Sequence, residues 1–538
     1  MVSIVNDRTN KMDLEVVFTE LGQFGRYQTW QYALLTIPLI ASAFEEMSYI
    51  FTSSEVDYRC FIPECEWPNT TDFLPSWLPN TVPYDGDPPE PKWCERYASR
   101  DSHNNSCSKD NFLDNVTETC DQWVFATKER TSATEFKLLC EDNVFKRTMV
   151  GTVNNFGLIT NYVIICYLSD RFGRKTMLLL LTLTQGLLVL AQSFAPTYSS
   201  FISLEYLVCF CSTFNTSFIL AIEIVGGDKR IFANCLMNTL YSLGEVIVAL
   251  IMWWVQDFRI LLRVIAGIKL ANLLYMWMVT ESIHWYMTKE YYEKVVSTVK
   301  NIAQCNKKEI SESTQHALNL LLAREEKAKQ SETKQQTRSV IRELLKSPAL
   351  LVRFGICSLT WLVNVFVYFG FSLMSVTLAG NKYFNFILMA LVEVPAYALM
   401  WIGMEFFNIG RKTTLVGTCF LAAVPCFIYL FVPSDADITR LCLFLLGKFA
   451  ITISYTVIYE VGAEVFPTEL RQSMVGLCCA VACLGGLFAP QIPLMAMYMN
   501  PMMLFFWLSV GAGCLSLMLP ETQGRSLPDT IMQAIKLT

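Results

Sequence analysis

The sequence predicts an all-α membrane protein whose twelve transmembrane helices form two parallel halves of six. Apolar runs of 18 or more residues recur along nearly the whole chain, which is the pattern of membrane spans. Short motifs that follow the second, fourth and sixth runs recur about 240 residues later. Of the 538 residues, 53% are hydrophobic and 17% charged, whereas about a quarter of an ordinary soluble chain is charged.

Reading for spans of roughly 20 residues gives twelve, at residues 30–52, 148–168, 176–195, 202–225, 231–254, 260–280, 350–374, 384–404, 413–432, 439–462, 473–495 and 501–519. Each must be helical, because lipid offers no hydrogen-bond partners to the backbone. The predicted units are an N-terminal segment 1–29, a first half 30–283 with a large loop 53–147, a linker 284–347, a second half 348–520 and a tail 521–538. Residues 1–29 are polar and mixed in charge, so we expect no signal peptide before the first span and expect this span to direct its own insertion.

Orientation follows from the basic residues in the short loops. The loops after spans 2, 4, 8 and 10 carry eight Lys and Arg, and the loops on the other side carry three. The positive-inside rule therefore places the first set, both termini and the linker in the cytoplasm. We expect a multi-pass protein of the plasma membrane, with the large loop outside the cell.

The contents of the large loop suit an extracellular, oxidising location. It contains six cysteines and three glycosylation sequons: Cys60, Cys65, Cys94, Cys107, Cys120 and Cys140, with Asn69, Asn104 and Asn115. Six cysteines allow fifteen pairings, and the sequence does not choose among them. We expect disulfides and glycans here.

The repeated motifs indicate one duplication of a six-helix unit. "DRFGRK" after span 2 matches "NIGRK" after span 8, with Gly173 and Gly410 in step. "EIVGGDKR" after span 4 matches "EVFPTELR" after span 10, and "TESIHW" after span 6 matches "PETQGRSL" after span 12. Two parallel six-helix halves joined by a linker are typical of secondary transporters, whose site lies near the midplane.

The motif residues have a predicted mechanical role. We expect Gly173 and Gly410 to permit tight turns and the neighbouring charges to anchor helix ends at the membrane interface. We also predict ion-pair latches between the halves that bias the inward-facing and outward-facing states; simple topological anchoring is the alternative. The gating residues are Asp170, Arg171, Gly173, Arg174, Glu223, Arg230, Gly410, Arg411, Glu464 and Arg471, with the latches Glu223–Arg230 and Glu464–Arg471.

Several stretches together resemble a known family. The loops "DRFGRK" and "GRKTTL" are similar to those of the major facilitator superfamily. "GQFGRYQ", the Cys-rich loop, "LVEVPAYALMW", "GKFAITISYTVIYEVGAEVFPTELRQ" and "LPETQGRSLPDTI" resemble the organic cation, anion and carnitine transporters, closest to the carnitine and zwitterion branch. The resemblance covers nearly the whole chain and implies a major facilitator fold.

The chain also departs from that family. "ESIHW" has Ile283 and His284 where the family usually has Pro and Arg. The family tends to have Asp in span 11 of cation transporters and Arg in anion and carnitine transporters, and the matching residue here is Cys483. Some anion transporters have a Lys in span 8, where Tyr397 stands here. The resemblance alone therefore leaves the sign of the substrate open.

Charged residues inside spans are candidate functional groups, because each costs about 2.5–3.5 kcal/mol on insertion scales. They are Glu45, Glu46, Glu245, Glu393 and Glu460, with Lys269 and Lys448. The acidic excess favours a positive or zwitterionic ligand. We expect Lys269 to pair with Glu245 and Lys448 with Glu393 or Glu460. On a helical wheel, Glu45 is central to a polar arc with Tyr49 that should face the cavity, whereas Glu46 borders the arc as its structural neighbour.

Aromatic side chains would suit an ammonium group, at about 0.5–2 kcal/mol for each cation–π contact. Trp361 and Tyr368 lie seven apart, and Tyr455 and Tyr459 lie four apart, so each pair shares a helix face; packing alone is the alternative. Asn364 could bond a polar tail. The predicted substrate residues are Glu45, Tyr49, Trp361, Asn364, Tyr368, Glu393, Tyr397, Tyr455, Tyr459 and Cys483.

The resulting expectation is a secondary-active or facilitative transporter of small organic cations or zwitterions, working by alternating access. The chain has three histidines, none of them in a span, and lacks GxxxxGK[ST], so we expect neither an enzyme nor an ATP-driven pump. We expect no cofactor, metal or nucleic acid; Na⁺ or H⁺ coupling stays open. The alternatives are an organic anion exchanger using Lys269, Lys448 or Arg263, and a non-transporting receptor or scaffold.

Overall fold

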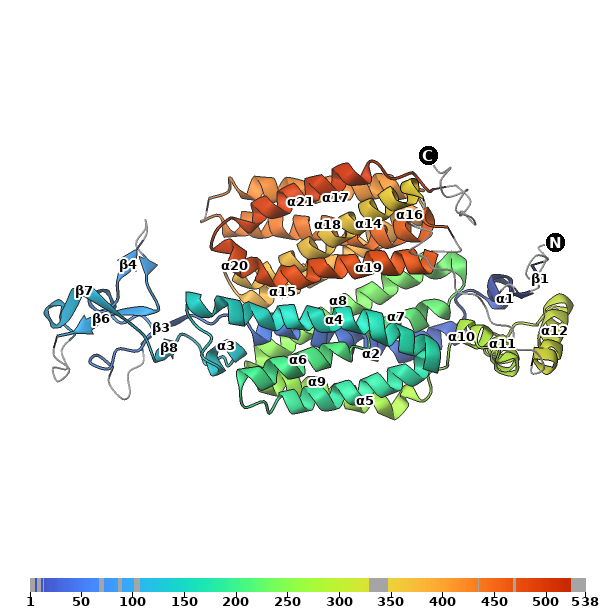
Figure 1. The fold of residues 1–538 in the computed structure, drawn as a ribbon, viewed down its shortest axis with the longest axis horizontal. Coiled ribbons are helices and arrows are strands. Elements are labelled where there is room, and N and C mark those ends of the chain that lie inside the picture. Colours follow the sequence, from blue (N-terminus) through green and yellow to red (C-terminus); the bar gives the residue numbers. More distant parts are fainter. Residues whose placement is uncertain are drawn as a thin grey trace.

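A computed structural model describes residues 5–6, 11–12, 14–66, 72–85, 90–100, 107–328, 347–433, 435–467 and 471–523. A helical bundle forms its centre (Figure 1). The strands of the large loop lie beyond one end of the bundle, and α1 (Leu14–Leu21) and α10–α12 lie beyond the other. We call these ends the loop face and the basic face, the latter carrying the turns at Gly173 and Gly410.

The first half consists of six spans. They are α2 (Arg26–Thr52), α4 (Val144–Phe172), α5 (Arg174–Gln192), α6 (Tyr198–Phe210) followed by α7 (Phe214–Glu223), α8 (Arg230–Val255) and α9 (Phe258–Met276). The expectation of one continuous helix over 202–225 is wrong, since the chain breaks between α6 and α7. Polar side chains at the break turn towards α2: Ser212 donates to Glu46, and Thr213 shares a 2.8 Å hydrogen bond with Ser42.

The second half repeats this order. It consists of α14 (Pro348–Met374) with η5 (Ser375–Thr377), α15 (Lys382–Leu391) with α16 (Glu393–Glu405), α17 (Arg411–Tyr429), α18 (Asp437–Val465), α19 (Arg471–Phe488) with η6 (Ala489–Gln491) and α20 (Ile492–Ala496), and α21 (Pro501–Ser516). The predicted span 384–404 is also broken, at Val392. Pro395 has no N–H to donate to the carbonyl four residues earlier, which explains a break at this point.

Ten spans among the described residues are long and apolar enough to cross a membrane by length and composition. The other two of the predicted twelve are α9 and α21. Helix α9 carries Arg259, Arg263 and Lys269, and α21 is only 16 residues long. Both occupy places in the bundle, α9 against α5 and α21 against α17. The fold therefore has twelve spans, as the sequence predicts.

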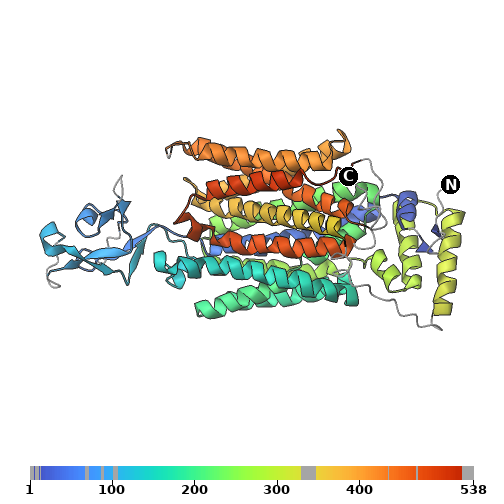
Figure 2. The same cartoon turned by 45° about the horizontal axis from the view of Figure 1, so that its top comes forward.

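The two halves meet along two pairs of spans. Helix α4 packs against α19, and α8 packs against α15 and α16; Figure 2 shows the α4–α19 pair running side by side. Large apolar side chains also cover the outside of the bundle, as at Trp254 and Leu274, which are 88% and 80% exposed. Such a surface suits lipid rather than water.

The large loop forms a small disulfide-linked unit. Its strands are β3 (Tyr58–Cys60), β4 (Tyr84–Asp85), β5 (Glu90–Pro91), β6 (Glu95–Ser99), β7 (Phe112–Thr119) and β8 (Trp123–Phe125), paired antiparallel as β3–β8, β4–β5 and β6–β7, with short helices η1 (Leu78–Asn80), η2 (Lys109–Asn111), α3 (Ser132–Glu135) and η3 (Glu141–Asn143). The structure selects one pairing of the six cysteines: Cys60–Cys120, Cys65–Cys107 and Cys94–Cys140.

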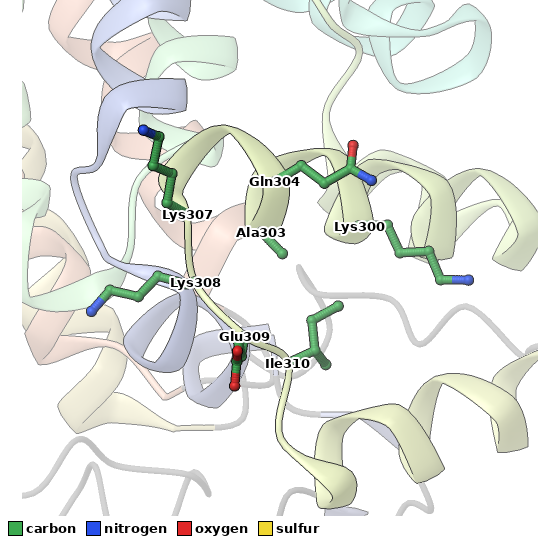
Figure 3. A pocket seen from close by; sticks show the side chains of 7 residues that line it. All are labelled: Lys300, Ala303, Gln304, Lys307, Lys308, Glu309 and Ile310. Carbon is green, nitrogen blue, oxygen red and sulfur yellow. The ribbon is translucent and has the colours of Figure 1, made fainter.

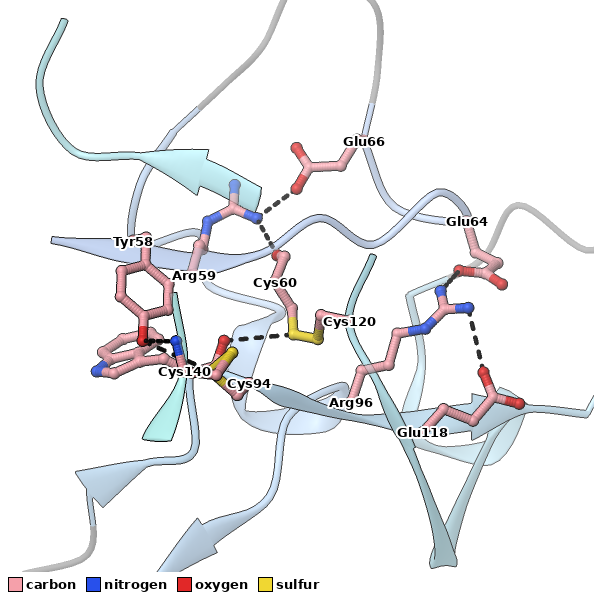
Figure 4. Close-up of a disulfide and its surroundings, with 11 residues drawn as sticks. Tyr58, Arg59, Cys60, Glu64, Glu66, Cys94, Arg96, Glu118, Cys120 and Cys140 are labelled. Atoms are coloured by element: carbon pink, nitrogen blue, oxygen red, sulfur yellow. Dashed lines mark hydrogen bonds and ion pairs between the residues drawn. A yellow bond between two sulfur atoms is a disulfide. The ribbon is translucent and has the colours of Figure 1, made fainter. Parts of the chain in front are cut away.

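Buried charge accompanies these disulfides (Figure 4). Arg59 is fully buried; it pairs with Glu66 and donates to the carbonyl of Cys60 at 3.0 Å. Arg96 lies between Glu64 and Glu118, at 3.5 and 3.2 Å. Of the predicted glycosylation sites, Asn115 is exposed on β7, which permits modification, while Asn69 and Asn104 lie outside the described residues.

One face of the linker helices is buried. Helices α10 (Ile283–Thr288), α11 (Tyr292–Asn306) and α12 (Glu312–Ala328) share an apolar core with α1. The hairpin β1 (Val5–Asn6) with β2 (Lys11–Met12) precedes α1. A shallow cavity of about 420 Å³ opens beside the end of α11 and the loop that follows it, lined by Lys300, Ala303, Gln304, Lys307, Lys308, Glu309 and Ile310 (Figure 3). It lies outside the bundle, away from the interface between the halves.

Candidate functional site

A repeated turn ends the second span of each half on the basic face. Gly173 has φ +104°, a conformation that side chains with a Cβ rarely adopt. Gly410 has φ −57°, a value that residues with a side chain also adopt. What both glycines provide is room: a Cβ at Gly173 would lie 2.5 Å from a carboxylate oxygen of Glu281, and one at Gly410 would overlap Glu521.

Those two carboxylates were missed as functional groups by the sequence reasoning. Glu281 accepts from the backbone N–H groups of Arg174 and Lys175 at 2.9 and 3.1 Å, at the start of α5. Glu521 stands in the same relation to the start of α17, accepting from Lys412 N–H at 3.4 Å. A carboxylate at a helix N-terminus satisfies orphan donors and opposes the helix dipole. The sequence did contain a signal for them, because Glu281 and Glu521 lie 240 residues apart in matching motifs.

The predicted latch carboxylates bind arginines of their own half. Arg174 is 3.3 Å from Glu223 and 2.8 Å from Asp170, and Arg411 is 2.8 Å from Glu464. These contacts join spans within a half, and the latches Glu223–Arg230 and Glu464–Arg471 stay predictions. Arg171 lies beside the ring of Phe172, Arg230 begins α8, and the side chain of Arg471 lies outside the described residues.

The second half buries an ion pair inside the bundle. Lys448 Nζ on α18 is 2.8 Å from Glu393 on α16, and both side chains are 0% exposed. This confirms one of the two pairings predicted for Lys448. Tyr368 and Tyr397 also donate to this carboxylate, at 2.6 and 3.2 Å, and Ser242 donates to it from the other half at 2.5 Å. Glu393 thus connects the two halves.

The first half buries a second ion pair, which corrects the expectation for Glu45. Lys269 on α9 is 3.1 Å from Glu45, and Gln185 on α5 bonds both. The predicted pairing of Lys269 with Glu245 is therefore wrong. The predicted cavity-facing orientation of Glu45 is wrong too, because its partners belong to the outer spans of the first half. A helical wheel fixes only relative angles on one helix, and the positions of α5 and α9 decided which face turned inward.

Glu46, rather than Glu45, lies towards the interface between the halves. It accepts from Ser212 at 2.8 Å and from Tyr241 at 3.0 Å, and it lies close enough to Tyr455 of the second half to interact electrostatically. Glu245 on α8 is 1% exposed, and its Oε1 accepts no hydrogen bond from the described residues. Glu393, Lys448 and Glu46 are its electrostatic neighbours. Both carboxylates therefore lie where the halves meet.

One buried carboxylate was overlooked in the sequence. Glu205 on α6 is 4% exposed and accepts from Asn154 at 2.8 Å and from Gln192. It could have been found, since it stands inside the predicted span 202–225. Neutral amides satisfy it rather than a cation, so it is a further buried carboxylate without a lysine.

Four of the predicted aromatic residues form one cluster between α14 and α18. The ring of Trp361 meets Tyr459 edge-on at 4.3 Å, and Tyr368 stacks on Tyr455 at 5.2 Å. The hydroxyls of Tyr455 and Tyr459 are 3.4 Å apart. Lys448 Nζ lies 3.2 Å from the centroid of Tyr368, so one ring of the cluster already faces a cation.

The other predicted substrate residues lie around this cluster. Asn364 donates to its own helix at Thr360, and its buried Oδ1 accepts nothing from the described residues. Cys483 on α19 is close enough to Tyr455 to interact electrostatically. Tyr397 joins the cluster through Glu393. Tyr49 lies apart, with its ring against α4 at Gly151.

Contacts between the halves close both ends of this region. Towards the loop face, Gln491 of η6 bonds Thr148 at 2.9 Å and Thr152 at 2.7 Å. Towards the basic face, Asn234 donates to Glu460 at 3.3 Å, and Lys229 lies 3.1 Å from Glu405. The aromatic cluster and the central carboxylates therefore lie between two sets of contacts that would have to open in turn.

Two pseudo-repeated halves, charges buried at their interface and contacts at both ends define a membrane transporter rather than an enzyme. The profile of the Major Facilitator Superfamily matches residues 148–490. The chain belongs to this superfamily.

Curated relatives match over nearly the full length. The chain is 30% identical to the "Organic cation transporter protein" of Drosophila melanogaster, covering 97% of this chain and 94% of that one. It is 27% identical to "Solute carrier family 22 member 3" of Mus musculus, covering 96% and 94%, and 27% identical to "Organic cation/carnitine transporter 2" of Homo sapiens, covering 98% and 94%.

Solved structures support the fold alone. A partially occluded inward-open conformation of the xylose transporter XylE from E. coli matches with a TM-score of 0.56 and 13% identity, covering 93% of this chain and all of that one. At this identity the likeness carries no information on substrate, but it agrees with the twelve-span architecture described above.

Proposed function

We propose that the protein transports small organic cations or zwitterions across the plasma membrane by alternating access, with both termini in the cytoplasm. The observation that carries the proposal is the cluster of Trp361, Tyr368, Tyr455 and Tyr459, beside carboxylates at the interface of the halves. Aromatic faces attract ammonium groups. The names of the relatives, which specify organic cations and carnitine, point to the same substrate class.

The charge distribution supports a cation over an anion. Both lysines buried in the spans, Lys269 and Lys448, are ion-paired to glutamates. Glu46 and Glu245 carry no ion pair within the described residues. An anion would therefore find neither of these lysines free, whereas a cation could pair with either carboxylate. An organic anion exchanger is the less favoured reading.

Transport assays separate the alternatives. Cells expressing the chain are given labelled carnitine, tetraethylammonium and an aromatic carboxylate. We expect uptake of the first, the second or both, driven for a monovalent cation by about 2.3 kcal/mol per 100 mV of membrane potential. Uptake of the carboxylate alone would contradict the proposal. No uptake despite surface expression would favour a receptor or scaffold.

The aromatic cluster can be tested within the same assay. Tyr455→Leu removes a ring from the cluster and should raise KM for the transported cation by about two-fold to thirty-fold, the range equivalent to one cation–π contact. Tyr455→Phe keeps the ring and should retain most of the affinity. Tyr206→Leu is the matched control, because Tyr206 stacks on Phe156 and Phe210 within the first half. Equal KM values for Tyr455→Leu and Tyr206→Leu would rule out the cluster as the cation site.

A further inference from the structure

A second cavity lies between the halves at the loop face, outside the central cluster. Its volume is about 350 Å³, within the range of small-molecule sites. The first half contributes Glu55, Tyr58, Cys140, Glu141, Val144 and Arg147, and the second contributes Leu373, Met374, Thr377, Ile492, Pro493, Ala496 and Met497. We call this cavity the vestibule.

The vestibule begins where the outer contacts between the halves end. The outer contact between Thr148 on α4 and Gln491 of η6 is a hydrogen bond of 2.9 Å. Each of these residues is next in sequence to a residue that lines the vestibule, Arg147 for Thr148 and Ile492 for Gln491. A molecule in the vestibule would therefore lie immediately outside this closure and touch both halves. The large loop holds the rim in place, because the Cys94–Cys140 disulfide and the hydrogen bond from Cys140 N–H to Tyr58 OH fix the start of α4 to it.

Arg147 is only partly satisfied in this position. Its Nη2 lies 2.9 Å from Glu55, while Nη1 is buried and has no acceptor among the described residues. The side chain is 11% exposed. A guanidinium has five donors in a fixed fork and binds a carboxylate with two of them. The edge that Glu55 leaves unused is thus suited to a ligand carboxylate.

Opposite charge stands in the same cavity. Glu141 is exposed and neither accepts a hydrogen bond nor forms an ion pair in the described part of the chain. The Tyr58 hydroxyl lies within electrostatic reach of Glu55, Glu141 and Arg147, so these charges share one small space. The opposite wall, from Leu373 and Met374 to Ile492 and Met497, is apolar and suits methyl groups on a quaternary nitrogen.

We propose that the vestibule is a second binding site, selective for small zwitterions that carry a carboxylate and a quaternary ammonium. Arg147 binds the carboxylate and Glu141 the ammonium, with the apolar wall around the methyl groups. This site deepens the proposed function. Binding in the vestibule does not depend on transport, and only the later movement of the bound molecule rests on the proposed function. It would select zwitterions over simple cations before the outer contacts open.

Two probes with one head group test this division of roles. Glycine betaine and choline share a trimethylammonium group, but only betaine has a carboxylate. Binding of both is measured on the purified full chain in nanodiscs, in a Tyr455→Leu background that weakens the central cluster. We expect Arg147→Gln to weaken betaine binding at least about ten-fold, as for the loss of a charge-assisted hydrogen bond, and to change choline binding less than two-fold.

Two further variants complete the test. Glu141→Gln should weaken both probes by a similar factor, since both carry the ammonium. Lys146→Gln is the matched control: it removes the neighbouring charge, which bonds Asn143 outside the cavity, and should change neither. Arg147→Lys keeps the charge and guards against misfolding, and it should retain choline binding while betaine binding falls.

The inference is overturned if Arg147→Gln leaves betaine binding unchanged or weakens both probes equally. Uptake by the unmutated chain is scored separately. If it moves neither probe while the binding pattern holds, the transport proposal fails and the vestibule site stands. If it moves the probes but Arg147→Gln has no selective effect on betaine, the vestibule proposal fails alone.

Discussion

The buried pair of Glu393 and Lys448 makes a quantitative prediction. Both side chains are 0% exposed, with the charged atoms 2.8 Å apart. Glu393→Gln keeps the shape but leaves Lys448 as an uncompensated buried cation. Breaking one partner of such a pair costs about 3–5 kcal/mol. The loss should be at the lower end of this range, because Ser372 Oγ at 2.7 Å and the ring of Tyr368 still contact the ammonium.

The opposite change, Lys448→Met, leaves Glu393 without its cation. Hydroxyl donors from Tyr368, Tyr397 and Ser242 remain, so this loss should be about 2–4 kcal/mol, less than for an unsatisfied charge. The double variant contains no buried charge at this site. It should lose no more than about 2 kcal/mol, because replacing a whole buried pair is often near neutral.

The assay is equilibrium unfolding in mixed micelles with increasing SDS, followed by tryptophan fluorescence. The three variants and the unmutated chain form a double-mutant cycle, and the expected coupling energy is about 3 kcal/mol or more. If the two single losses add to the double loss within about 0.5 kcal/mol, the usual tolerance for independent sites, the pair contributes nothing as a pair and the reasoning is refuted.

The remaining predictions concern the other buried and capping groups. Glu45→Gln should reduce surface expression strongly by leaving Lys269 unpaired, whereas Glu46→Gln should spare expression and reduce cation uptake; the reverse pattern, scored by surface labelling and uptake, would restore the sequence-based assignment. Gly173→Ala should lower the melting temperature through its positive φ and its contact with Glu281, at about 1–2 kcal/mol or more, while Gly417→Ala, in open space on α17, should not. Burial raises the pKa of Glu521, but backbone N–H donors from Gln523, Lys412 and Thr522 outweigh it and hold the pKa below its usual value of 4.5. The stability that ionised Glu521 contributes to the folded state is therefore fully present above pH 4.5. It is lost as the pH falls through the lower pKa of Glu521 in the folded state. The melting temperature of Glu521→Gln should change less between pH 3 and 6 than that of the unmutated chain. An identical pH dependence of the two melting temperatures would argue against the cap. Cys94→Ser with Cys140→Ser should destabilise the large loop by about 4 kcal/mol on chain-entropy grounds for a separation of 46 residues, seen as faster limited proteolysis near the start of α4; unchanged proteolysis would show that other contacts hold the loop.

Much of the fold could be predicted because it depends on hydrophobicity along the chain. Spans long and apolar enough to enter lipid, and the repeat that pairs Glu281 with Glu521, are visible in the letters alone. The breaks at Cys211–Thr213 and Val392 were not, because neither interrupts the surrounding apolar run for long enough to end a span. They are set by side chains that bond elsewhere, as Ser212 bonds Glu46, or by a missing donor at Pro395.

Contacts of the candidate site were predictable between residues on the same helix, but not between residues on different helices. Trp361 with Tyr368, and Tyr455 with Tyr459, are each related by helical spacing, but the stacking of Tyr368 on Tyr455 depends on how α14 lies against α18. Glu141 and Arg147 gave no signal in the sequence. Their cavity exists only because the start of α4 faces α20 of the other half.

The sequence by itself determined the twelve spans, the two halves and the set of charges that must be buried, because the cost of placing polar groups in lipid acts on each segment alone. The tertiary structure decided which carboxylate meets which lysine. Lys269 pairs with Glu45 and leaves Glu245 at the interface, since an ion pair depends on the rotation and approach of two helices. Only packing fixes those, and with them which charges remain for a substrate.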